Sequence, residues 1–219
     1  SHRGAGKTMI AESMLLASGV INRLGKTEDG TTASDYEPEE TKRTNSIQTS
    51  ILPCPWDGHK INVLDTPGYA DFRGEVISGA QAAEGAVVVV AAQAGIEVGT
   101  QQMWQIAEDL NLPRIIVINK MDRENSDFQG VLDSLSETFG RQCVGVHVPI
   151  GSEESFSGLV NLLNPESDVP EGMETQVEMA RERLVEAVAE SDDALVAKYL
   201  EGEGLSADEL ISGLKEGVR

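Results

Sequence analysis

The chain has 219 residues, of which 40% are hydrophobic and 25% are charged. These proportions exclude a disordered tail, a collagen-like fibre and a disulfide-stabilised mini-protein. Lys and Arg number 17 against 37 Asp and Glu, and the formal net charge of −20 excludes a general attraction to nucleic acid or anionic lipid. Residues 151–219 hold 17 acidic and 5 basic side chains, whereas residues 1–150 hold 20 and 12, which predicts a boundary near residue 150.

The hydrophobic pattern predicts a helix over residues 7–18 as the first element, followed by a long polar loop over 22–46. Two strands come next, joined by a tight hairpin turn at Asp57-Gly58. Beyond them, amphipathic helices alternate with β-branched strands, which predicts an α/β fold with a mostly parallel sheet between helix layers. The expected strands are 47–53, 59–65, 86–92, 114–119 and 143–149, and the expected helices between them are 71–83, 97–111 and 126–139.

The acidic last third has a helical pattern. Apolar residues at helical spacing predict helices around 177–188 and 195–200, and Ser206 with Glu209 forms a capping box that opens another. We therefore expect a small, acidic, largely helical subdomain over 151–219.

Cysteine content and hydropathy indicate the cellular compartment in which the protein is expected. Only Cys54 and Cys143 occur, which favours a reducing, cytoplasmic compartment. The longest apolar run is far too short to span a bilayer. We expect a monomer that binds neither DNA nor a membrane.

The first motif, Ser1-His2-Arg3-Gly4-Ala5-Gly6-Lys7-Thr8, matches the phosphate-loop pattern G-x-x-x-x-G-K-S/T with Ser in the first position. The backbone N–H groups of Gly4, Ala5 and Gly6 can converge on phosphate oxygens at a helix N-terminus. Lys7 can reach the β- and γ-phosphates, and Thr8 can supply a hydroxyl to Mg²⁺. An ordinary glycine-rich helix cap is the alternative. The motif normally follows a strand, so we expect the chain to begin part-way into its domain.

The second motif is Asp65-Thr66-Pro67-Gly68, at the end of a predicted strand. Asp65 can hold Mg²⁺ through water, and the N–H of Gly68 can meet a γ-phosphate. Asp127 to Gly130 has the same spacing, but we interpret it as part of a helix surface. The position of Asp65 at a strand end distinguishes the two.

The third motif is Asn119-Lys120-Met121-Asp122, again at a strand end. Guanine presents N1–H and a 2-amino group as adjacent donors, and the two oxygens of Asp122 can accept both. Adenine lacks this pair, so a buried Asp122 would discriminate by roughly 10³-fold or more. Asn119 would tie the loop together and Lys120 would lie along the base. A polar loop is the alternative.

All three motifs occur in the order that a guanine-nucleotide site needs, each where a strand meets a loop. Their combination predicts binding of GTP and GDP with Mg²⁺. In a doubly wound sheet the loops at one edge share a ligand, which explains why motifs far apart in sequence would act together.

The sequence resembles translational GTPases of the elongation factor G family, and within it the elongation factor G-like paralogues. The similarity covers essentially the whole chain, including the stretches INRLGKTEDGTTASDY, HKINVLDTPGYADF, GIEVGTQQMWQIAEDLNLPRIIVINKMDR and PIGSEESFSG. It implies a P-loop NTPase-type three-layer α/β/α core over 1–150 and the start of an inserted subdomain over 151–219. It also implies further domains and a fifth guanine motif beyond Arg219, with the ribosome as partner of the full-length protein.

By the same resemblance, residues 22–46 are switch I and residues 65–72 are switch II, and GTP hydrolysis moves both. Three departures stand out. Arg43-Thr44-Asn45-Ser46-Ile47 replaces the family's Arg-Gly-Ile-Thr-Ile, so that Ser46 supplies the hydroxyl expected on Mg²⁺. Tyr69 follows Gly68 where the family has the His that orients the attacking water, and Gly4 stands where many relatives have Asp. The resemblance thus gives Lys7, Gly68 and Tyr69 as the catalytic set.

Several alternatives remain open at this point. Tyr69 is a poor base near neutrality because its reference pKa is about 10, so the chain could be a GTP-binding switch with little or no hydrolysis. A tetracycline ribosome-protection factor or a release-factor-type GTPase would share the same motifs. The acidic helices could dock a ribosomal stalk protein, although a solvated face is the simpler interpretation.

Overall fold

The computed structural model describes residues 1–164, 166–202 and 204–217. The chain forms two compact units. The first unit comprises Ser1–Ala91 and Glu97–Asn119, and the second comprises Ala92–Ile96 and Lys120–Arg219. The functional boundary near residue 150, between a core and an insert, stays a prediction.

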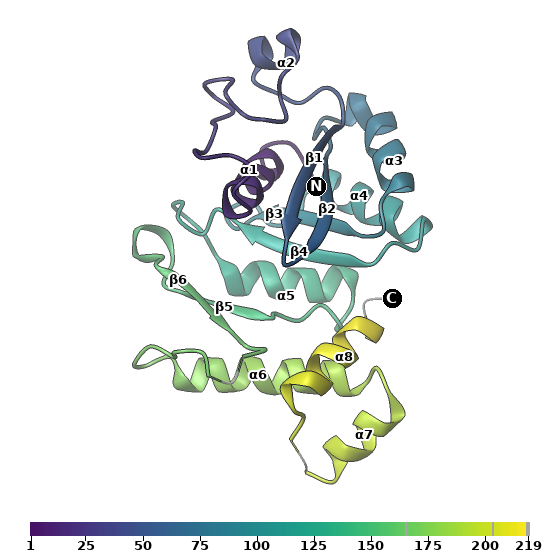
Figure 1. Cartoon of the computed structure of the whole chain (residues 1–219). Helices are drawn as coiled ribbons and strands as arrows, with labels where there is room; N and C mark the ends of the chain where they lie inside the picture. The colour runs from purple at the N-terminus through teal and green to yellow at the C-terminus, as the bar shows by residue number, and fades with distance from the viewer. Residues whose placement is uncertain (165, 203, 218–219) are drawn as a thin grey trace. The chain divides into compact units, whose positions relative to one another are not determined.

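The first unit contains two strand pairs and the helices that cover them (Figure 1). The antiparallel pair has the predicted hairpin, because Asp57 and Gly58 both adopt positive φ, 46° and 75°. The other pair is parallel and is connected through a helix. In chain order the elements are α1 (Lys7–Ala17), α2 (Pro38–Arg43), β1 (Ser50–Trp56), β2 (His59–Asp65), η1 (Ala70–Phe72), α3 (Arg73–Ala82), β3 (Ala86–Ala91), α4 (Val98–Asp109) and β4 (Arg114–Asn119).

The parallel pair β3–β4 sets the edge at which one motif lies. Its sequence AVVVVA gives β3 a continuous apolar run, and four of its six residues are buried. The register pairs Ala86 with Arg114 and Ala91 with Asn119, so both strands end at the same edge. Asn119 is therefore held at a strand end, as the motif requires.

A small core packs α1 against the hairpin, and Figure 1 shows the helix beside β1 and β2. The apolar face of α1 contributes Ala11 and Leu15, and the inward face of β1 contributes Leu52 and Cys54. Because the side chains of β1 alternate between buried and exposed along Ser50 to Cys54, one face of the hairpin is covered by α1. This packing fixes the start of α1, where the phosphate loop ends.

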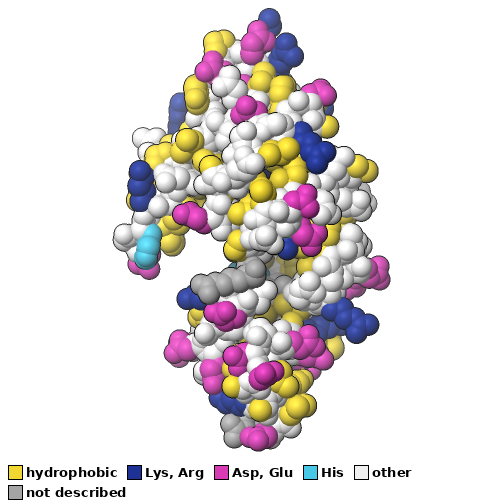
Figure 2. Space-filling view, turned by 90° about the vertical axis from the view of Figure 1, so that its right-hand side faces the viewer, with side chains coloured by type: hydrophobic (Ala, Val, Ile, Leu, Met, Phe, Trp, Pro, Cys, Tyr) yellow, Lys and Arg dark blue, Asp and Glu magenta, His cyan; other side chains and the backbone are white. Residues whose placement is uncertain are grey.

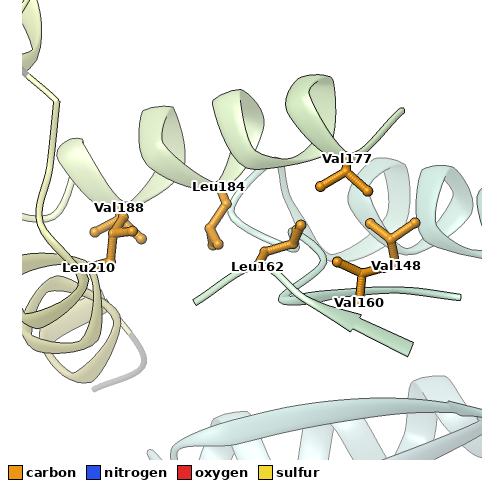
Figure 3. Close-up of a cluster of buried hydrophobic side chains, with 7 residues drawn as sticks. All are labelled: Val148, Val160, Leu162, Val177, Leu184, Val188 and Leu210. Carbon is orange, nitrogen blue, oxygen red and sulfur yellow. The ribbon is translucent and has the colours of Figure 1, made fainter. Parts of the chain in front are cut away.

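The second unit has its own core, drawn in Figure 3. Val177, Leu184 and Val188 point from one face of α6 toward the strand pair β5–β6, and Leu210 of α8 meets Val188. The elements are α5 (Phe128–Phe139), β5 (His147–Ile150), η2 (Glu153–Ser155), β6 (Gly158–Asn161), α6 (Glu174–Ala189), α7 (Asp193–Leu200) and α8 (Ala207–Gly217). The helices predicted from the apolar stripes correspond to α6, α7 and α8.

The prediction of a mostly parallel sheet is wrong for the described residues. They form three two-stranded sheets, of which only β3–β4 is parallel. The strand expected at 143–149 lies at 147–150 and pairs antiparallel with β6, a strand that the pattern did not predict. The connection over 151–157 explains the outcome, because a parallel partner needs a crossover of about a dozen residues or more.

The polar loop at 22–46 contains a short helix, α2, which begins with Pro38. Acidic side chains are spread across the face in Figure 2 rather than gathered into one patch. Within the described ranges, no helix is both long and apolar enough to cross a bilayer.

Candidate nucleotide site

The phosphate loop has the backbone that its glycines permit. Gly4 and Gly6 have φ of 78° and 99°, in the region that L-residues with a Cβ rarely adopt. Gly6 is the N-cap of α1, and its carbonyl accepts the N–H of Ile10 at 3.0 Å. The loop therefore ends at the positive N-terminal end of a helix, a place that favours phosphate.

His2 anchors the loop from the other side, a contact that the sequence patterns did not indicate. Its ring is buried, with Nδ1 3.2 Å from Oγ1 of Thr100 and Nε2 3.3 Å from Oε1 of Glu97. Both partners lie at the start of α4. A motif search assigns no role to this position, because the residue acts through packing rather than through the ligand.

Lys7 has its ammonium group folded back onto the loop. Nζ donates to the carbonyl of His2 at 3.1 Å and to that of Ser1 at 3.5 Å. Burial lowers the pKa of Lys7, and the charge of Asp65 acts in the opposite direction. A phosphate anion would add negative charge beside Lys7 and so favour its charged form further.

Three residues predicted to serve Mg²⁺ lie together, although they come from distant parts of the chain. Oγ1 of Thr8 donates to Oδ2 of Asp65 at 2.8 Å and lies 3.4 Å from Oγ of Ser46. Burial raises the pKa of Asp65, while the Thr8 hydroxyl and the Lys7 charge lower it. Thr8 opens α1, Asp65 ends β2, and Ser46 lies between α2 and β1.

Asp35 adds a carboxylate that the sequence analysis missed. It is buried, and among the described residues neither of its oxygens has a hydrogen-bond partner. Its charge contributes to the raised pKa of Asp65, so the two carboxylates interact electrostatically. The signal was weak because Asp35 lies in a polar loop, where an acidic residue is normally solvated.

This set of donors fits Mg²⁺. The described residues contain no group of three or more His, Cys, Asp or Glu that could hold a metal alone. Mg²⁺, however, binds through one or two carboxylates, with phosphate and water oxygens completing its shell. Asp65 with the hydroxyls of Thr8 and Ser46 would provide such a partial shell, and the unpartnered Asp35 carboxylate could accept a hydrogen bond from a water of that shell.

Gly68 makes a close approach to the phosphate loop. A Cβ at this position would lie 2.6 Å from Nζ of Lys7 and 2.9 Å from Cα of Arg3. Only glycine fits without moving the backbone. The next residue, Tyr69, has the guanidinium carbon of Arg3 4.5 Å from its ring centroid.

Two buried glutamates shape the loop predicted as switch I. Oε2 of Glu12 accepts the N–H of Gly25 at 3.0 Å, and Oε1 of Glu40 accepts those of Ile47 and Gln48 at 2.8 and 3.0 Å. Both carboxylates are almost fully buried. They satisfy backbone donors that would otherwise be orphaned, which explains how so polar a segment keeps a defined path.

Asn119 connects its motif to the phosphate loop. Its Nδ2 donates to the carbonyl of Ala5 at 2.9 Å, a contact between residues 114 apart in sequence. Ala5 is completely buried. Asn119 therefore ties its strand end to the loop that would cradle phosphate, whereas its expected role within the guanine-reading loop stays a prediction.

Asp122 and Lys120 belong to the second unit. Lys120 has a positive φ of 63°, and the side chain of Asp122 is 64% exposed, with Oδ2 3.7 Å from Nε of Arg123. Asp122 lines a hollow of about 960 Å³ together with Gln93, Arg123, Glu124, Asn125 and residues 152–155.

The loop at 152–155 braces this motif. The N–H of Glu153 donates to the carbonyl of Met121 at 2.8 Å, and Oε1 of Glu153 accepts the N–H of Asn125 at 2.6 Å. Ser126 also donates to the carbonyl of Met121, at 2.9 Å. By contrast, Asp127 caps α5 by accepting the N–H of Gly130, so this second D-x-x-G is a helix start.

The first unit therefore brings together Gly4, Ala5, Gly6, Lys7, Thr8, Ser46, Asp65, Gly68, Tyr69 and Asn119. The second unit holds Lys120 and Asp122, with Asp122 in its own hollow. Arg3, His2 and Asp35 are the additions that the structure makes to the residues singled out in the sequence.

Comparison with known proteins gives two findings. The family model of the elongation factor Tu GTP binding domain matches residues 1–211. The crystal structure of ttk003000868 from Thermus thermophilus is similar with a TM-score of 0.89 and 33% sequence identity. The similarity covers 99% of this chain and 35% of that chain, so this sequence spans about a third of that protein's length. The chain belongs to the family of the elongation factor Tu GTP binding domain.

Proposed function

We propose that this chain binds GTP and GDP with Mg²⁺ and hydrolyses GTP as part of a translation factor resembling elongation factor G, which acts on the ribosome in the cytoplasm. Family membership makes it a GTP-binding domain of the translational GTPase type. The observation that carries the finer proposal is the contact of Thr8 with Asp65 and Ser46, because three distant segments meet where α1 begins.

Each residue has a definite part in the proposed reaction. The amides of Gly4 to Gly6 and the ammonium group of Lys7 bind the phosphates. Thr8, Ser46 and Asp65 would hold Mg²⁺, which when bound neutralises charge on the β- and γ-phosphates.

The segment after β2 acts on the terminal phosphate. The N–H of Gly68 faces that phosphate, and the hydroxyl of Tyr69 positions the attacking water. Because catalysis in this class consists of positioning and charge stabilisation, a stimulating partner can raise turnover by up to about 10⁵-fold. The ribosome is the proposed partner here, and loss of the γ-phosphate releases both switch loops.

Base specificity is assigned to Asp122, supported by Lys120 along the base. The test is displacement of a fluorescent guanine nucleotide by unlabelled GTP, GDP and ATP. The roughly 10³-fold discrimination expected from the sequence required a buried Asp122, whereas its side chain is 64% exposed. We expect ATP to compete more weakly than GTP and GDP, because adenine offers the carboxylate of Asp122 neither of the two donors that guanine presents. Equal competition by ATP would contradict the proposal.

A matched pair of variants refines this test. Asp122→Asn replaces one acceptor with a donor and should weaken GDP binding strongly. Glu124→Gln removes the same charge from the same hollow and should leave binding unchanged. Equal weakening by both variants would mean that the motif contributes charge and not base recognition.

A GTP-binding switch with little hydrolysis is the second candidate, favoured by Tyr69 in place of the family's His. Ribosome-stimulated turnover of Tyr69→His decides between the two. A large gain from a near-zero baseline supports the switch, whereas an already fast parent that gains nothing supports hydrolysis. The proposed oligomeric state is a monomer, and docking of a ribosomal stalk protein on the acidic helices is the proposal for a further partner.

A further inference from the structure

Arg3 and Tyr69 form a cation–π pair that none of the motifs predicts. The guanidinium carbon of Arg3 lies 4.5 Å from the centroid of the Tyr69 ring, inside the distance of about 6 Å over which such pairs attract. Arg3 occupies one of the variable positions of the phosphate loop. Tyr69 follows Gly68 in the segment after β2.

The backbone of Arg3 is held firmly on both sides. His2, which precedes it, is buried against the start of α4, and Gly4, which follows it, has the positive φ that turns the loop. Gly68 packs directly on this backbone, because a Cβ there would lie 2.9 Å from Cα and 3.1 Å from N of Arg3. These contacts constrain the backbone from which the Arg3 side chain extends.

The ring of Tyr69 is held from a second direction by Phe72. The two rings meet edge to face, with centroids 6.4 Å apart and planes at 85°. Tyr69 is the N-cap of η1, and its carbonyl accepts the N–H of Phe72 at 3.1 Å. With Arg3 over its face and Phe72 at its side, the ring has little rotational freedom.

This pair lies beside the group that would bind the terminal phosphate. A Cβ on Gly68 would meet both the backbone of Arg3 and Nζ of Lys7. Gly68, the residue before Tyr69, therefore lies close to both groups. We infer that Arg3 is a positioning residue, which holds Tyr69 beside the terminal phosphate so that the phosphate loop itself sets the place of the tyrosine. This inference rests on the proposed function.

The test is a double-mutant cycle with Arg3→Met, Tyr69→Leu and the double variant, measured in the full chain. Arg3→Met should lower the kcat for GTP about 2- to 5-fold with KM unchanged, which is the range expected for a partly exposed cation–π pair. Tyr69→Leu also removes the hydroxyl proposed to position the water, so it should lower kcat further. The double variant should be no worse than the more damaging single one, because the two residues act as a unit. Additive losses, or an equal change in KM, would overturn the inference.

Two further variants separate stacking from charge. Arg3→Lys keeps the charge but lacks the planar group, so it should recover only part of the lost kcat. Arg183→Met, on the exposed face of α6, removes one positive charge elsewhere and should have no effect. Full recovery of kcat with Arg3→Lys would mean that the charge of Arg3, and not its stacking on Tyr69, maintains kcat, which would overturn the inference.

A second readout does not depend on turnover. The stack is made by two side chains of this chain, so the same cycle on the thermal unfolding midpoint of the chain should also be non-additive, and additive shifts would overturn the inference. A parent that binds GTP without hydrolysing it would contradict the proposed hydrolysis alone. In that event the ratio of GDP to GTP dissociation constants replaces kcat, and an unchanged ratio in Arg3→Met overturns the inference.

Discussion

At the scale of single residues, burial of charge is the dominant feature of the phosphate end of the site. Asp65 and Asp35 are both buried, and the electrostatic interactions of Asp65 with Asp35 and with Lys7 place three ionisable groups close together. Burial raises the pKa of Asp65 above its ordinary value, so the folded state binds a proton more tightly than the unfolded chain does. Ionised Asp65 therefore costs stability in the absence of a metal.

Asp65→Asn should accordingly stabilise the nucleotide-free chain at neutral pH while removing the response to Mg²⁺. The stabilisation should shrink as the pH falls through the raised pKa of Asp65, because the parent carboxyl is then neutral as well. Thermal unfolding with and without Mg²⁺, across a pH series, measures both effects. Asp168→Asn, an exposed carboxylate in the second unit, serves as the control. A lower unfolding midpoint in Asp65→Asn at neutral pH would contradict this account.

The sequence predicts residues with a fixed motif spacing better than residues that act through burial. Thr8, Ser46 and Asp65 were all expected near one ion, and they lie in contact. Glu12 and Glu40 were not expected to matter, because the sequence around an acidic residue of a helix does not distinguish a buried carboxylate from a solvated one. Their backbone partners, such as Gly25 and Ile47, carry no side-chain signal at all.

At the scale of elements, α7 and α8 are joined by an ion pair with a clear pH signature. Nζ of Lys198 lies 2.8 Å from Oε1 of Glu209, and the backbone and hydroxyl of Ser206 also donate to Glu209. The Lys198 contact, followed by the Ser206 contacts, lowers the pKa of Glu209 to about 2. A depressed carboxylate pKa stabilises the fold above the unfolded value and loses that effect as the pH falls.

Glu209→Gln should therefore reduce the loss of stability that the parent shows on acidification from about pH 5 downward. The two proteins should converge at low pH, where Glu209 is protonated in both the folded and the unfolded parent. Urea denaturation at several pH values provides the measurement. Glu178→Gln on the exposed face of α6 is the matched control, and a parent-like pH profile for Glu209→Gln would argue against the ion pair.

The core of the second unit depends on α6. Leu184 is fully buried and points at the strand pair, so Leu184→Ala should lower the free energy of unfolding by about 2–5 kcal/mol. Leu200, 77% exposed at the end of α7, should tolerate the same change almost without effect. Chemical denaturation of both variants makes the comparison, and equal losses would contradict the assignment of the core.

Strand pairing was predicted correctly where the hydrophobic pattern and the length of the connecting segment both favoured the same pairing. The apolar runs of β3 and β4 indicated buried parallel strands, and the helix between them allows that pairing. The pairing of β5 failed because an apolar run does not identify its partner. The short segment after Ile150 permits a return in the opposite direction, and the four-residue strand β6 is too brief to show a period of two.

At the scale of the whole molecule, the formal net charge of −20 sets the response to salt. Like charges spread over a folded surface repel one another more than they do in an expanded chain, so screening should favour the folded state. Raising ionic strength from about 0.01 to 0.15 M shortens the Debye length from roughly 30 to 8 Å.

The unfolding midpoint of the chain should therefore rise with KCl over this range. An uncharged osmolyte at equal osmolarity is the control, because it changes water activity without screening. A midpoint that falls as KCl is added would indicate that attractive ion pairs such as Lys198–Glu209 outweigh the general repulsion.

The hydrogen bond from Asn119 to Ala5 also has a consequence for biosynthesis. Its two ends are 114 residues apart, so the phosphate loop is not complete until the fourth strand has been made. During synthesis, the octapeptide therefore precedes its hydrogen-bond partner Asn119 by more than a hundred residues. If the octapeptide binds phosphate as proposed, we expect its affinity for nucleotide to develop only after β4 has paired with β3.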